Sequence, residues 1–467
     1  MIDLKRSVTV LTRLSLVMGA LDAASDSALA TPERPQNVVL ILADDLGYGD
    51  LGSYGNRWHE TPTLDRLASE GMRFTAAYAC PNCTPSRAAL LSGKSAARTG
   101  LTFPLLPDFR VQRRNAGKPL IEPPLPPGLA LEERTLAEAL KERGYATAIF
   151  GKWHLGRGDF LPAHQGFDAV FGTDDAELPG SIRRWFGPDY GIPVEAGVPG
   201  EYFTDRLTQE AERFLESNRE QPFFLYLSHY AVHARHFGKP EVEARFEQKP
   251  GRPEGATPQL AAMLLGLDES VGRVLQKLDE LRLTESTLVV FMSDNGGLVQ
   301  NQSNGVLRAG KGWLYEGGIR VPLLVKWPGK VRPGTITDEP VVIEDIYPTL
   351  VEAAGGGRSH PERDGVSLVA LLEGKAQLEV RPIAIHMPHY AGGGGFPGTA
   401  LRWGDWKVIE NFAASGVELF NLREDIGETR NLAVEQPERL REMRARLHAW
   451  RQQVGAQMMT PATTATE

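Results

Sequence analysis

Four mainly apolar runs of the chain lack the alternation of a half-exposed strand. They cover residues 37–43, 145–150, 223–228 and 286–292. Continuous apolar runs of this length are typical of parallel strands buried on both faces. Between them, helical spacing of apolar side chains is found at residues 63–70, 135–143 and 258–283. The alternation predicts an α/β fold, with a large, mixed but mostly parallel sheet flanked by helices.

A polar cluster follows each of these four runs. The side chains are Asp44 and Asp45, Lys152 and His154, His229 and His233, and Asp294 and Asn295. The carboxyl ends of parallel strands lie at one edge of a sheet, where open α/β folds bind their ligands. We therefore expect these side chains to meet in one site suited to a metal ion or an oxyanion.

The pattern changes after about residue 355. Three glycines at 355–357 indicate a connection. Residues 380–425 then predict short strands joined by turns, and residues 437–454 predict a closing amphipathic helix. We expect a catalytic domain over 35–370, a small antiparallel α+β subdomain over 371–455 and a disordered tail over 456–467.

The N-terminal residues have the features of an export signal. Basic residues up to Arg13 precede a short apolar run at 14–21, and Ala28-Leu29-Ala30 fits a small-residue cleavage site. We predict a signal peptide over 1–30 and a periplasmic or secreted protein. A disordered N-terminal extension is the alternative. No later run is long enough to predict a membrane span.

Charge and cysteine content narrow the function classes. The net charge is −8, from 51 basic and 59 acidic residues, which argues against a nucleic-acid partner. The two cysteines, Cys80 and Cys83, cannot form a disulfide framework. No second Cys-x-x-Cys completes a zinc ribbon, but a redox pair remains possible.

Residues 83–93 predict a short helix. Residues 88–91 are strong helix formers, Pro85 suits the first turn and Gly93 the C-cap. Cys83 would then lie at the positive end of the helix dipole with Arg87 one turn away, an arrangement that favours a thiolate. A half-buried loop cysteine is the alternative interpretation.

The sequence Cys83-Thr84-Pro85-Ser86-Arg87, followed by Ala-Ala-Leu-Leu-Ser-Gly, closely resembles the signature of the type I sulfatases. In that family a separate formylglycine-generating enzyme oxidises the signature cysteine to formylglycine. The resemblance implies this modification of Cys83 and an alkaline phosphatase/sulfatase-like fold. Glu418 to Leu422, with Gly427-Glu428-Thr429 behind it, resembles a motif of the family's C-terminal subdomain.

The oxygen-bearing residues of the polar clusters indicate a hard cation. Carboxylate and amide oxygens suit calcium or magnesium, and no dense His/Cys set accompanies them as zinc would require. The resemblance implies a Ca²⁺ site, in preference to Mg²⁺. Its ligands would be Asp44, Asp45, Asp294 and Asn295, together with the modified Cys83.

The remaining site residues receive roles from the same resemblance. Arg87 would orient residue 83, while Lys152 and Lys311 would bind the sulfate oxygens. His154 would assist release of sulfate, and His233 would protonate the leaving group. Histidine suits both tasks because its usual pKa lies near neutrality. Of the nearby pair, His229 is expected to be structural. The glycines beside both lysines would let the backbone approach the ligand.

We expect a sulfated carbohydrate as substrate. Its negative groups would meet basic side chains at Arg110, Arg113, Arg114, Lys118, Arg183 and Arg184, and its rings would stack on Trp185, Trp403 and Trp406. Acidic residues at 174–177, where arylsulfatase-like members often have a polar sulfate contact, argue against a simple aryl ester preference. Two alternatives remain: a phosphomonoester or phosphodiester hydrolase of the same superfold, and a non-catalytic binder of sulfated glycans.

Overall fold

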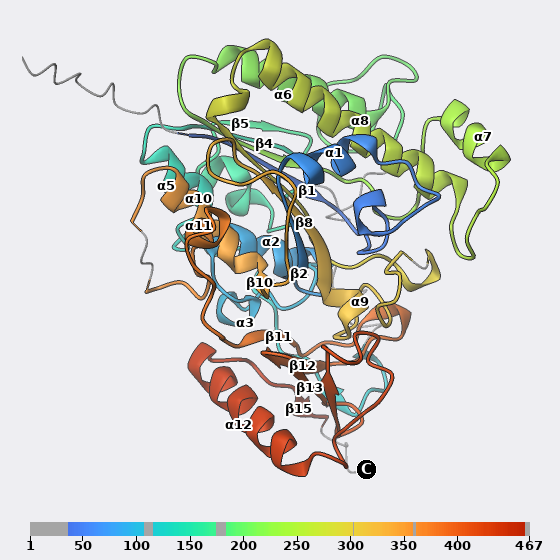
Figure 1. Ribbon diagram of the computed structural model, residues 1–467, viewed down its shortest axis with the longest axis vertical. Coiled ribbons are helices and arrows are strands. Elements are labelled where there is room, and N and C mark those ends of the chain that lie inside the picture. The colour runs from blue at the N-terminus through green and yellow to red at the C-terminus, as the bar shows by residue number, and fades with distance from the viewer. Residues whose placement is uncertain (1–35, 107–114, 174–183, 302, 358–360, 463–467) are drawn as a thin grey trace, which may run out of the picture. The chain divides into compact units, whose positions relative to one another are not determined.

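A nine-stranded sheet forms the centre of the computed structural model, which describes residues 36–106, 115–173, 184–301, 303–357 and 361–462 (Figure 1). Its strand order is β10-β2-β8-β7-β1-β6-β4-β5, and β9 pairs with β2. The strands are β1 (Asn37–Ala43), β2 (Met72–Tyr78), β4 (Ala146–Gly151), β5 (Ala169–Phe171), β6 (Phe223–Ser228), β7 (Thr287–Ser293), β8 (Arg320–Lys326), β9 (Thr335–Thr337) and β10 (Val341–Val342).

The pairing is parallel between β1 and both of its neighbours, β6 and β7, and again between β6 and β4. β8 runs antiparallel to β7 and to β2. The predicted large, mixed and mostly parallel sheet is therefore confirmed. The bounds of β1 and β6 coincide with the predicted apolar runs.

Helices cover both faces of this sheet (Figure 1). One face packs against α2 (Cys83–Ser92), α5 (Leu136–Lys141), α10 (Ile346–Ala353) and α11 (Val369–Leu372). The other packs against α1 (Pro62–Glu70), α6 (Phe203–Ser217) and α8 (Pro258–Glu280). Further helices are α3 (Ala96–Thr99), α7 (Pro240–Gln248) and α9 (Glu316–Ile319).

Strand β1 shows why a central strand is apolar at every position. Val38, Leu40 and Leu42 belong to one core, whereas Val39 and Ile41 belong to the core on the opposite face. Successive side chains of a strand point to opposite faces. Both faces are covered, so neither set can be polar without burying an unsatisfied group.

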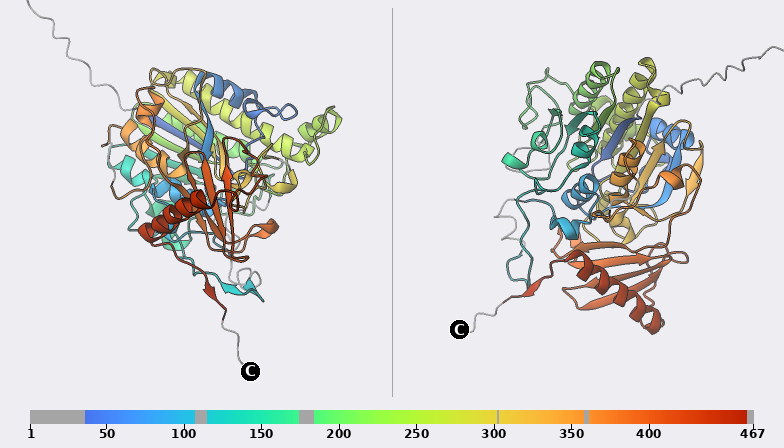
Figure 2. Two further views of the ribbon diagram at one scale, coloured as in Figure 1. Left: turned by 60° about the horizontal axis from the view of Figure 1, so that its bottom comes forward. Right: turned by 90° about the vertical axis from the view of Figure 1, so that its left-hand side faces the viewer.

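A separate four-stranded antiparallel sheet follows in the C-terminal part (Figure 2). Its strands are β11 (Ile383–Met387), β12 (Gly398–Trp403), β13 (Trp406–Asn411) and β14 (Gly416–Asn421). Helix α12 (Pro437–Val454) packs on one face through Met443, Leu447 and Trp450. The other face packs against Tyr78 and Leu314 of the preceding part. The small antiparallel α+β unit is as predicted.

The segment after α12 differs from the expected disordered tail. Strand β15 (Thr460–Pro461) pairs with β3 (Leu120–Ile121), and the carbonyl of Gln457 lies 2.8 Å from His386 Nε2. These contacts tie the segment after α12 to β3 and to β11, long-range pairings that no local pattern reveals. Residues 463–467 and the predicted signal peptide lie outside the described residues. Within the part of the chain that is described, no helix has the length and hydropathy of a membrane span.

Candidate active site

The carboxyl ends of strands β1, β7 and β4 bring three of the predicted polar clusters together. Asp44 and Asp45 follow β1, and Asp294 follows the adjacent β7, where the Asp45 amide donates to Asp294 Oδ1 at 3.2 Å. Lys152 follows β4, on the far side of β6. All four side chains are nearly or fully buried. The site therefore lies at the sheet edge where open α/β folds bind ligands.

Cys83 is the first residue of α2 and projects into this cluster. Its Sγ lies 3.4 Å from Asp44 Oδ1, 3.9 Å from Asp45 Oδ1 and 3.4 Å from Lys311 Nζ. The helix position agrees with the sequence, but the expectation of a favoured thiolate is wrong. Burial raises the pKa of the Cys83 thiol, and the Asp44 carboxylate raises it further; Lys152 and Lys311 only partly oppose this.

Cys80 lies outside the acidic cluster. Both cysteines are free and buried. Burial raises the pKa of the Cys80 thiol well above its usual value, with a contribution from Glu344. Neither thiol thus has the low pKa that a reactive Cys-x-x-Cys pair needs, which argues against the redox alternative.

Three cations offset the acidic residues: Lys152 and Arg87 are fully buried, and Lys311 is partly exposed. Lys152 Nζ is 2.6 Å from Asp44 Oδ2, and Lys311 Nζ is 2.6 Å from Asp45 Oδ1. Arg87 donates from Nε and NH2 to Asp294 Oδ2 at 3.1 and 2.8 Å. Buried carboxylates at such separations are tolerated only when they are paired. The cluster is therefore a site whose charge balance depends on its cations.

The pKa values of Asp294 and Asp45 reflect their burial and the charges around them. Burial raises the pKa of Asp294 to about 6, and Asp44 adds to the rise while Arg87 opposes it. Burial also acts to raise the pKa of Asp45, but Lys311, His233 and Lys152 together bring it well below its usual value. Additional positive charge would favour the ionised form of Asp294.

The donor set fits a hard cation. The Oδ1 atom of Asn295 is buried and has no hydrogen-bond partner among the described residues, while its Nδ2 donates to Asp45 Oδ1 at 2.8 Å. Ligand atoms of Asp44, Asp45, Cys83 and His233 all lie within 4.8 Å of one another. A free amide oxygen beside carboxylate oxygens is the arrangement that Ca²⁺ and Mg²⁺ bind.

Two histidines border the cluster. His233 Nε2 lies 3.7 Å from Asp45 Oδ2, and the side chain is partly exposed. Loss of solvation, with the positive charges of Lys311 and Lys152, lowers the pKa of His233 to about 3 against the opposing effect of Asp45. His154 Nε2 is 3.4 Å from the Leu105 carbonyl. Burial, with Lys152 and Arg87, lowers the pKa of His154 well below its usual value.

His229 is placed differently from His233. Its ring is fully buried and its Nε2 lies 3.4 Å from Ser270 Oγ on α8. Burial lowers the pKa of His229 to about 3. The ring therefore packs between β6 and α8, and it is absent from the group of ligand atoms around Asp45.

The glycines beside the two lysines serve a different purpose from the one expected. A Cβ on Gly151 would lie 1.9 Å from the Ser228 carbonyl oxygen, and one on Gly310 would lie 2.3 Å from the Gly297 carbonyl oxygen. These glycines allow close approach of another protein segment, not of a ligand. Gly151 also has φ +107°, a region that side-chain-bearing residues rarely adopt.

Two hydroxyl residues support the site and were not predicted. Ser228, the last residue of β6, accepts from Arg87 NH1 at 2.5 Å and donates to the Lys152 carbonyl at 2.7 Å. Thr84 donates to the His154 carbonyl at 3.0 Å. The position of Ser228 directly before the His229–His233 cluster was the available sequence signal.

Among the described residues, the tryptophans expected to bind carbohydrate pack against other parts of the protein. Trp185 is 5% exposed and packs against Tyr202, so its faces are not available to a sugar ring. Trp403 lies under Arg446 of α12 at 3.9 Å and Trp406 under Arg439 at 5.3 Å. Both are partly buried and pack against the core beneath α12, so stacking on a substrate is not supported. Arg110, Arg113, Arg114, Asp174, Asp175, Glu177 and Arg183 lie outside the described residues.

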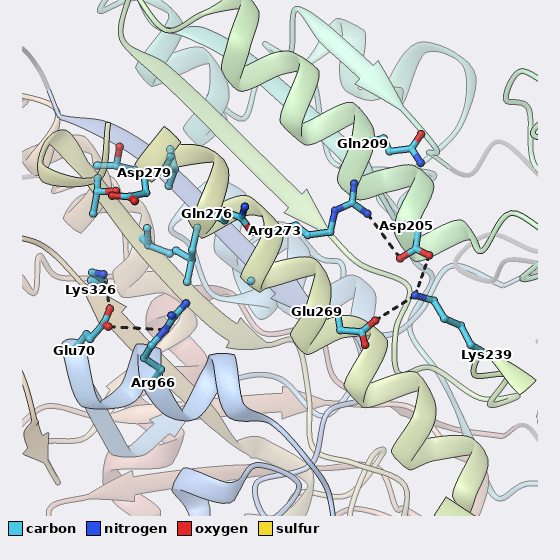
Figure 3. A pocket seen from close by; sticks show the side chains of 16 residues that line it. Arg66, Glu70, Asp205, Gln209, Lys239, Glu269, Arg273, Gln276, Asp279 and Lys326 are labelled. Carbon is cyan, nitrogen blue, oxygen red and sulfur yellow. Dashed lines mark hydrogen bonds and ion pairs between the residues drawn. The ribbon is translucent and has the colours of Figure 1, made fainter. Parts of the chain in front are cut away.

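A pocket of 820 Å³ between α1, α6 and α8 is distant from these residues (Figure 3). Thr287 and Val289 line it, at the amino end of β7, whereas Asp294 follows the carboxyl end of that strand. Its charged side chains are paired with one another, as Lys239 is with Asp205 and Glu269. Its size alone therefore does not make it the reaction site.

Comparisons with known proteins agree with the site geometry. Residues 36–356 match the family model described as Sulfatase, and residues 309–455 match the model described as N-sulphoglucosamine sulphohydrolase, C-terminal. The chain is 34% identical to mouse steryl-sulfatase, over 90% of this chain and 82% of that protein. It is 39% identical to human arylsulfatase A, over 73% of this chain and 68% of that protein.

A solved structure has the same architecture. The crystal structure of Ps i-CgsB in complex with k-i-k-neocarrahexaose superimposes with a TM-score of 0.76 at 29% identity, covering 89% of this chain and 93% of that one. The Sulfatase model spans most of the chain, including every residue of the acidic and basic cluster described above. The chain therefore belongs to the sulfatase family of the alkaline phosphatase superfamily and is a sulfatase.

Proposed function

We propose that this sulfatase cleaves sulfate monoesters with a formylglycine derived from Cys83 and a bound Ca²⁺. The observation that carries the proposal is the arrangement around Cys83 Sγ. Two carboxylates and the Lys311 ammonium lie within 3.9 Å of it. A transferring sulfuryl group needs a nucleophile and cations for its non-bridging oxygens at one point, and Cys83 occupies that point.

Four residues would hold the Ca²⁺ ion, together with the modified side chain of residue 83. They are Asp44, Asp45, Asp294 and Asn295, whose Oδ1 is available. The ion would lower the pKa of a hydroxyl group bound to it. Its positive charge would also balance the carboxylates of Asp44 and Asp45, with which Lys152 and Lys311 are paired in this structure. Those two ammonium groups are then available for the sulfate oxygens.

Oxidation of Cys83 by a formylglycine-generating enzyme would supply an aldehyde, whose hydrate is the nucleophile. Arg87 orients the residues around it, because its guanidinium bonds Asp294, Ser228 and the Lys152 carbonyl at once. The planar guanidinium group holds its N–H donors in a fixed geometry. Arg87 thus fixes the acidic cluster relative to β4 and β6 while Lys152 and Lys311 bind the substrate.

Proton transfers fall to the two histidines. His233 is near Asp45 and partly exposed, so it can reach the leaving oxygen of an entering ester. Its low pKa keeps it neutral in this charge state, and the added negative charge of a sulfate ester would raise that pKa. His154 sits beside Lys152 and is proposed to accept the proton that accompanies sulfate release.

The chemical selectivity has a direct test. We expect turnover of 4-nitrophenyl sulfate to exceed that of 4-nitrophenyl phosphate, since both esters release the same alcohol. The phosphohydrolase alternative predicts the reverse order. A protein that binds sulfated oligosaccharides but turns over neither ester would instead be the non-catalytic glycan binder.

We further propose a sulfated carbohydrate as substrate and an exported location. Support comes from the oligosaccharide bound to Ps i-CgsB and from the match of the C-terminal part to the N-sulphoglucosamine sulphohydrolase model. Steryl-sulfatase and arylsulfatase A represent the alternative substrate classes. The test compares kcat/KM for a panel of sulfated oligosaccharides with that for an aryl and a steryl sulfate. Highest kcat/KM on either small ester would overturn this proposal.

A further inference from the structure

Two segments of the chain have no part in the chemistry described so far, and the structure brings them together. One is the segment 315–320, which contains α9, and the other is Gly427-Glu428-Thr429. Their carboxylates, Glu316 and Glu428, meet at one lysine, Lys407, the second residue of β13. In Figure 1, α9 lies beside the C-terminal sheet that contains this strand.

Lys407 is enclosed by both carboxylates. Its Nζ is 2.9 Å from Glu316 Oε1 and 2.8 Å from Glu428 Oε1, and all three side chains are 1% exposed or less. Glu428 Oε2 also accepts from the Glu316 backbone amide at 2.6 Å. The lysine thus joins the C-terminal sheet to the first residue of α9.

The charges of this group are balanced by a second cation. Arg320 NH1 lies 3.2 Å from Glu316 Oε2, which also accepts from the Tyr78 hydroxyl at 2.8 Å. Burial raises the pKa of Glu428 and Glu316 raises it further, while Lys407 acts in the opposite direction. Removing Lys407 alone would leave a buried carboxylate without its partner, which is strongly destabilising.

The turn that begins at Glu316 packs directly on the candidate active site. Gly296, next to Asn295, donates to the Gly318 carbonyl at 3.0 Å, and Gly317 donates to the Arg308 carbonyl at 2.9 Å. A Cβ on Gly296 would lie 1.8 Å from the Gly317 carbonyl oxygen. The two backbones are therefore in contact with no space between them.

The same turn adjoins the segment that carries Lys311. A Cβ on Gly317 would lie 2.4 Å from the Ala309 carbonyl oxygen, and the Lys311 amide donates to the Gly297 carbonyl at 3.0 Å. Residues 295–297, 308–311 and 316–318 hence form one packed unit. A shift of Glu316 would displace Asn295 and Lys311 together.

We propose that Lys407 is a positioning residue, through which the C-terminal sheet holds Asn295 and Lys311 in place. The inference rests on the proposed function, in which these two residues contact Ca²⁺ and sulfate. Displacement of a binding group by a fraction of an ångström to one ångström lowers rates on the order of ten- to a hundredfold. The C-terminal subdomain then contributes to turnover without touching substrate.

The test uses the full-length, formylglycine-containing enzyme and the variant Lys407→Met. We expect kcat/KM to fall on the order of tenfold or more. Calorimetry should show weaker binding of Ca²⁺ by the metal-stripped protein and of inorganic sulfate by the loaded protein. These two affinities report on Asn295 and Lys311 independently of turnover.

The double variant Lys407→Met/Glu428→Gln separates positioning from stability. It removes one charge of each sign, so the melting temperature should recover toward that of the wild type. The link to the C-terminal sheet is still missing, so both affinities and kcat/KM should stay reduced. If Lys407 only stabilised the fold, the melting temperature, the Ca²⁺ and sulfate affinities and kcat/KM would all recover in the double variant.

Glu410→Gln is the matched control on the same strand. Glu410 pairs with Arg444, Arg451 and His448 of α12, on the side away from α9. This variant should lower the melting temperature but leave the Ca²⁺ and sulfate affinities unchanged.

The outcomes distinguish the two proposals. If the wild type binds neither Ca²⁺ nor sulfate, the proposed function fails. If the wild type binds both and folded Lys407→Met keeps its affinities and kcat/KM, the positioning role is wrong. Should Lys407→Met not fold, the double variant decides by the same criteria, because it removes the contact of Lys407 with Glu316 without leaving Glu428 as an unpaired charge.

Discussion

At Cys83 two effects on the thiol oppose each other. The N-terminus of α2 favours a thiolate, but burial and the Asp44 carboxylate raise the pKa of the thiol. The second effect wins because the thiol is buried, and the negative charge of Asp44, 3.4 Å away, adds to the cost of ionising it. An unmodified cysteine here is a poor nucleophile, and this is consistent with a role as the precursor of another group.

Substitution of each cysteine tests this assignment. Cys83→Ala should abolish turnover and leave the fold intact, because only Cys83 contacts the acidic cluster. Cys80→Ala is the matched control and should retain most activity. The measurement is kcat/KM with circular dichroism on both variants. Equal loss of activity in the two variants would support a redox pair instead.

Asp294 tests the metal assignment. Asp294→Ala should lower Ca²⁺ occupancy and turnover together, because it removes a proposed ligand and leaves Arg87 unpaired. Elemental analysis with activity assays measures both quantities. Asp268→Asn is the control, since Asp268 is equally buried but caps α1 by accepting from Thr63 and Leu64 amides. Full activity of metal-stripped wild type would contradict the Ca²⁺ site.

At the scale of elements, the end of β4 depends on a glycine. Gly151→Ala should destabilise the fold and lower kcat, because its Cβ would meet the Ser228 carbonyl and displace Lys152. Gly144→Ala is the control: Gly144 also has positive φ, but a Cβ there would meet nothing within 4 Å. It should cost only the strain of positive φ, about 1–2 kcal/mol.

Urea unfolding and kinetics compare the two glycine variants. Both should lose stability, with the larger loss in Gly151→Ala, and only that variant should lose turnover. Equal losses of stability with unchanged kcat would mean that the close approach to Ser228 does not position Lys152.

The sequence predicted best those elements whose own residues show a clear apolar pattern or clear helix-end residues. β1 and β6 are apolar at every position because both faces are covered, and α12 begins at a proline in its first turn and ends before Gly455. The strand ends then located the acidic, amide and histidine side chains and Lys152 through the geometry of parallel sheets, whereas Cys83, Arg87 and Lys311 were assigned from the resemblance. Their proposed roles came from the resemblance of the motif around Cys83.

Other features depend on contacts between residues that are distant in sequence. The pairing of β15 with β3 and the contact of Lys407 with Glu316 leave no periodic signal. Of the tryptophans expected to bind sugars, Trp185 lies in a core, and Trp403 and Trp406 pack against the core beneath α12; these contacts form only in the folded chain. Local patterns cannot distinguish an aromatic core residue from a binding surface.

For the molecule as a whole, buried acids give a pH dependence of stability. Burial raises the pKa of Glu344 from its usual 4.5 to about 8, and Asp345 adds to this. Between these values the folded state binds the extra proton, so this group's contribution to stability is lost as pH rises toward 8. The slope from one such group is at most about 1.4 kcal/mol per pH unit.

Glu344→Gln removes this titration. The variant should gain stability relative to wild type as the pH increases from 5 to 9, measured by urea unfolding at several pH values. Glu379→Gln, at an exposed position, should follow the wild-type curve. An unchanged difference between wild type and Glu344→Gln across this range would show that Glu344 does not titrate as its burial predicts.

The whole arrangement of strands, cations and acids converges on the side chain of residue 83, so its chemical state is the most direct test. The measurement is the mass of the proteolytic peptide containing Cys83, from enzyme produced together with a formylglycine-generating enzyme. We predict loss of the thiol, gain of an aldehyde that reacts with a hydrazide probe, and specific activity proportional to the modified fraction. Full sulfatase activity in protein whose Cys83 remains an unmodified thiol would contradict the account.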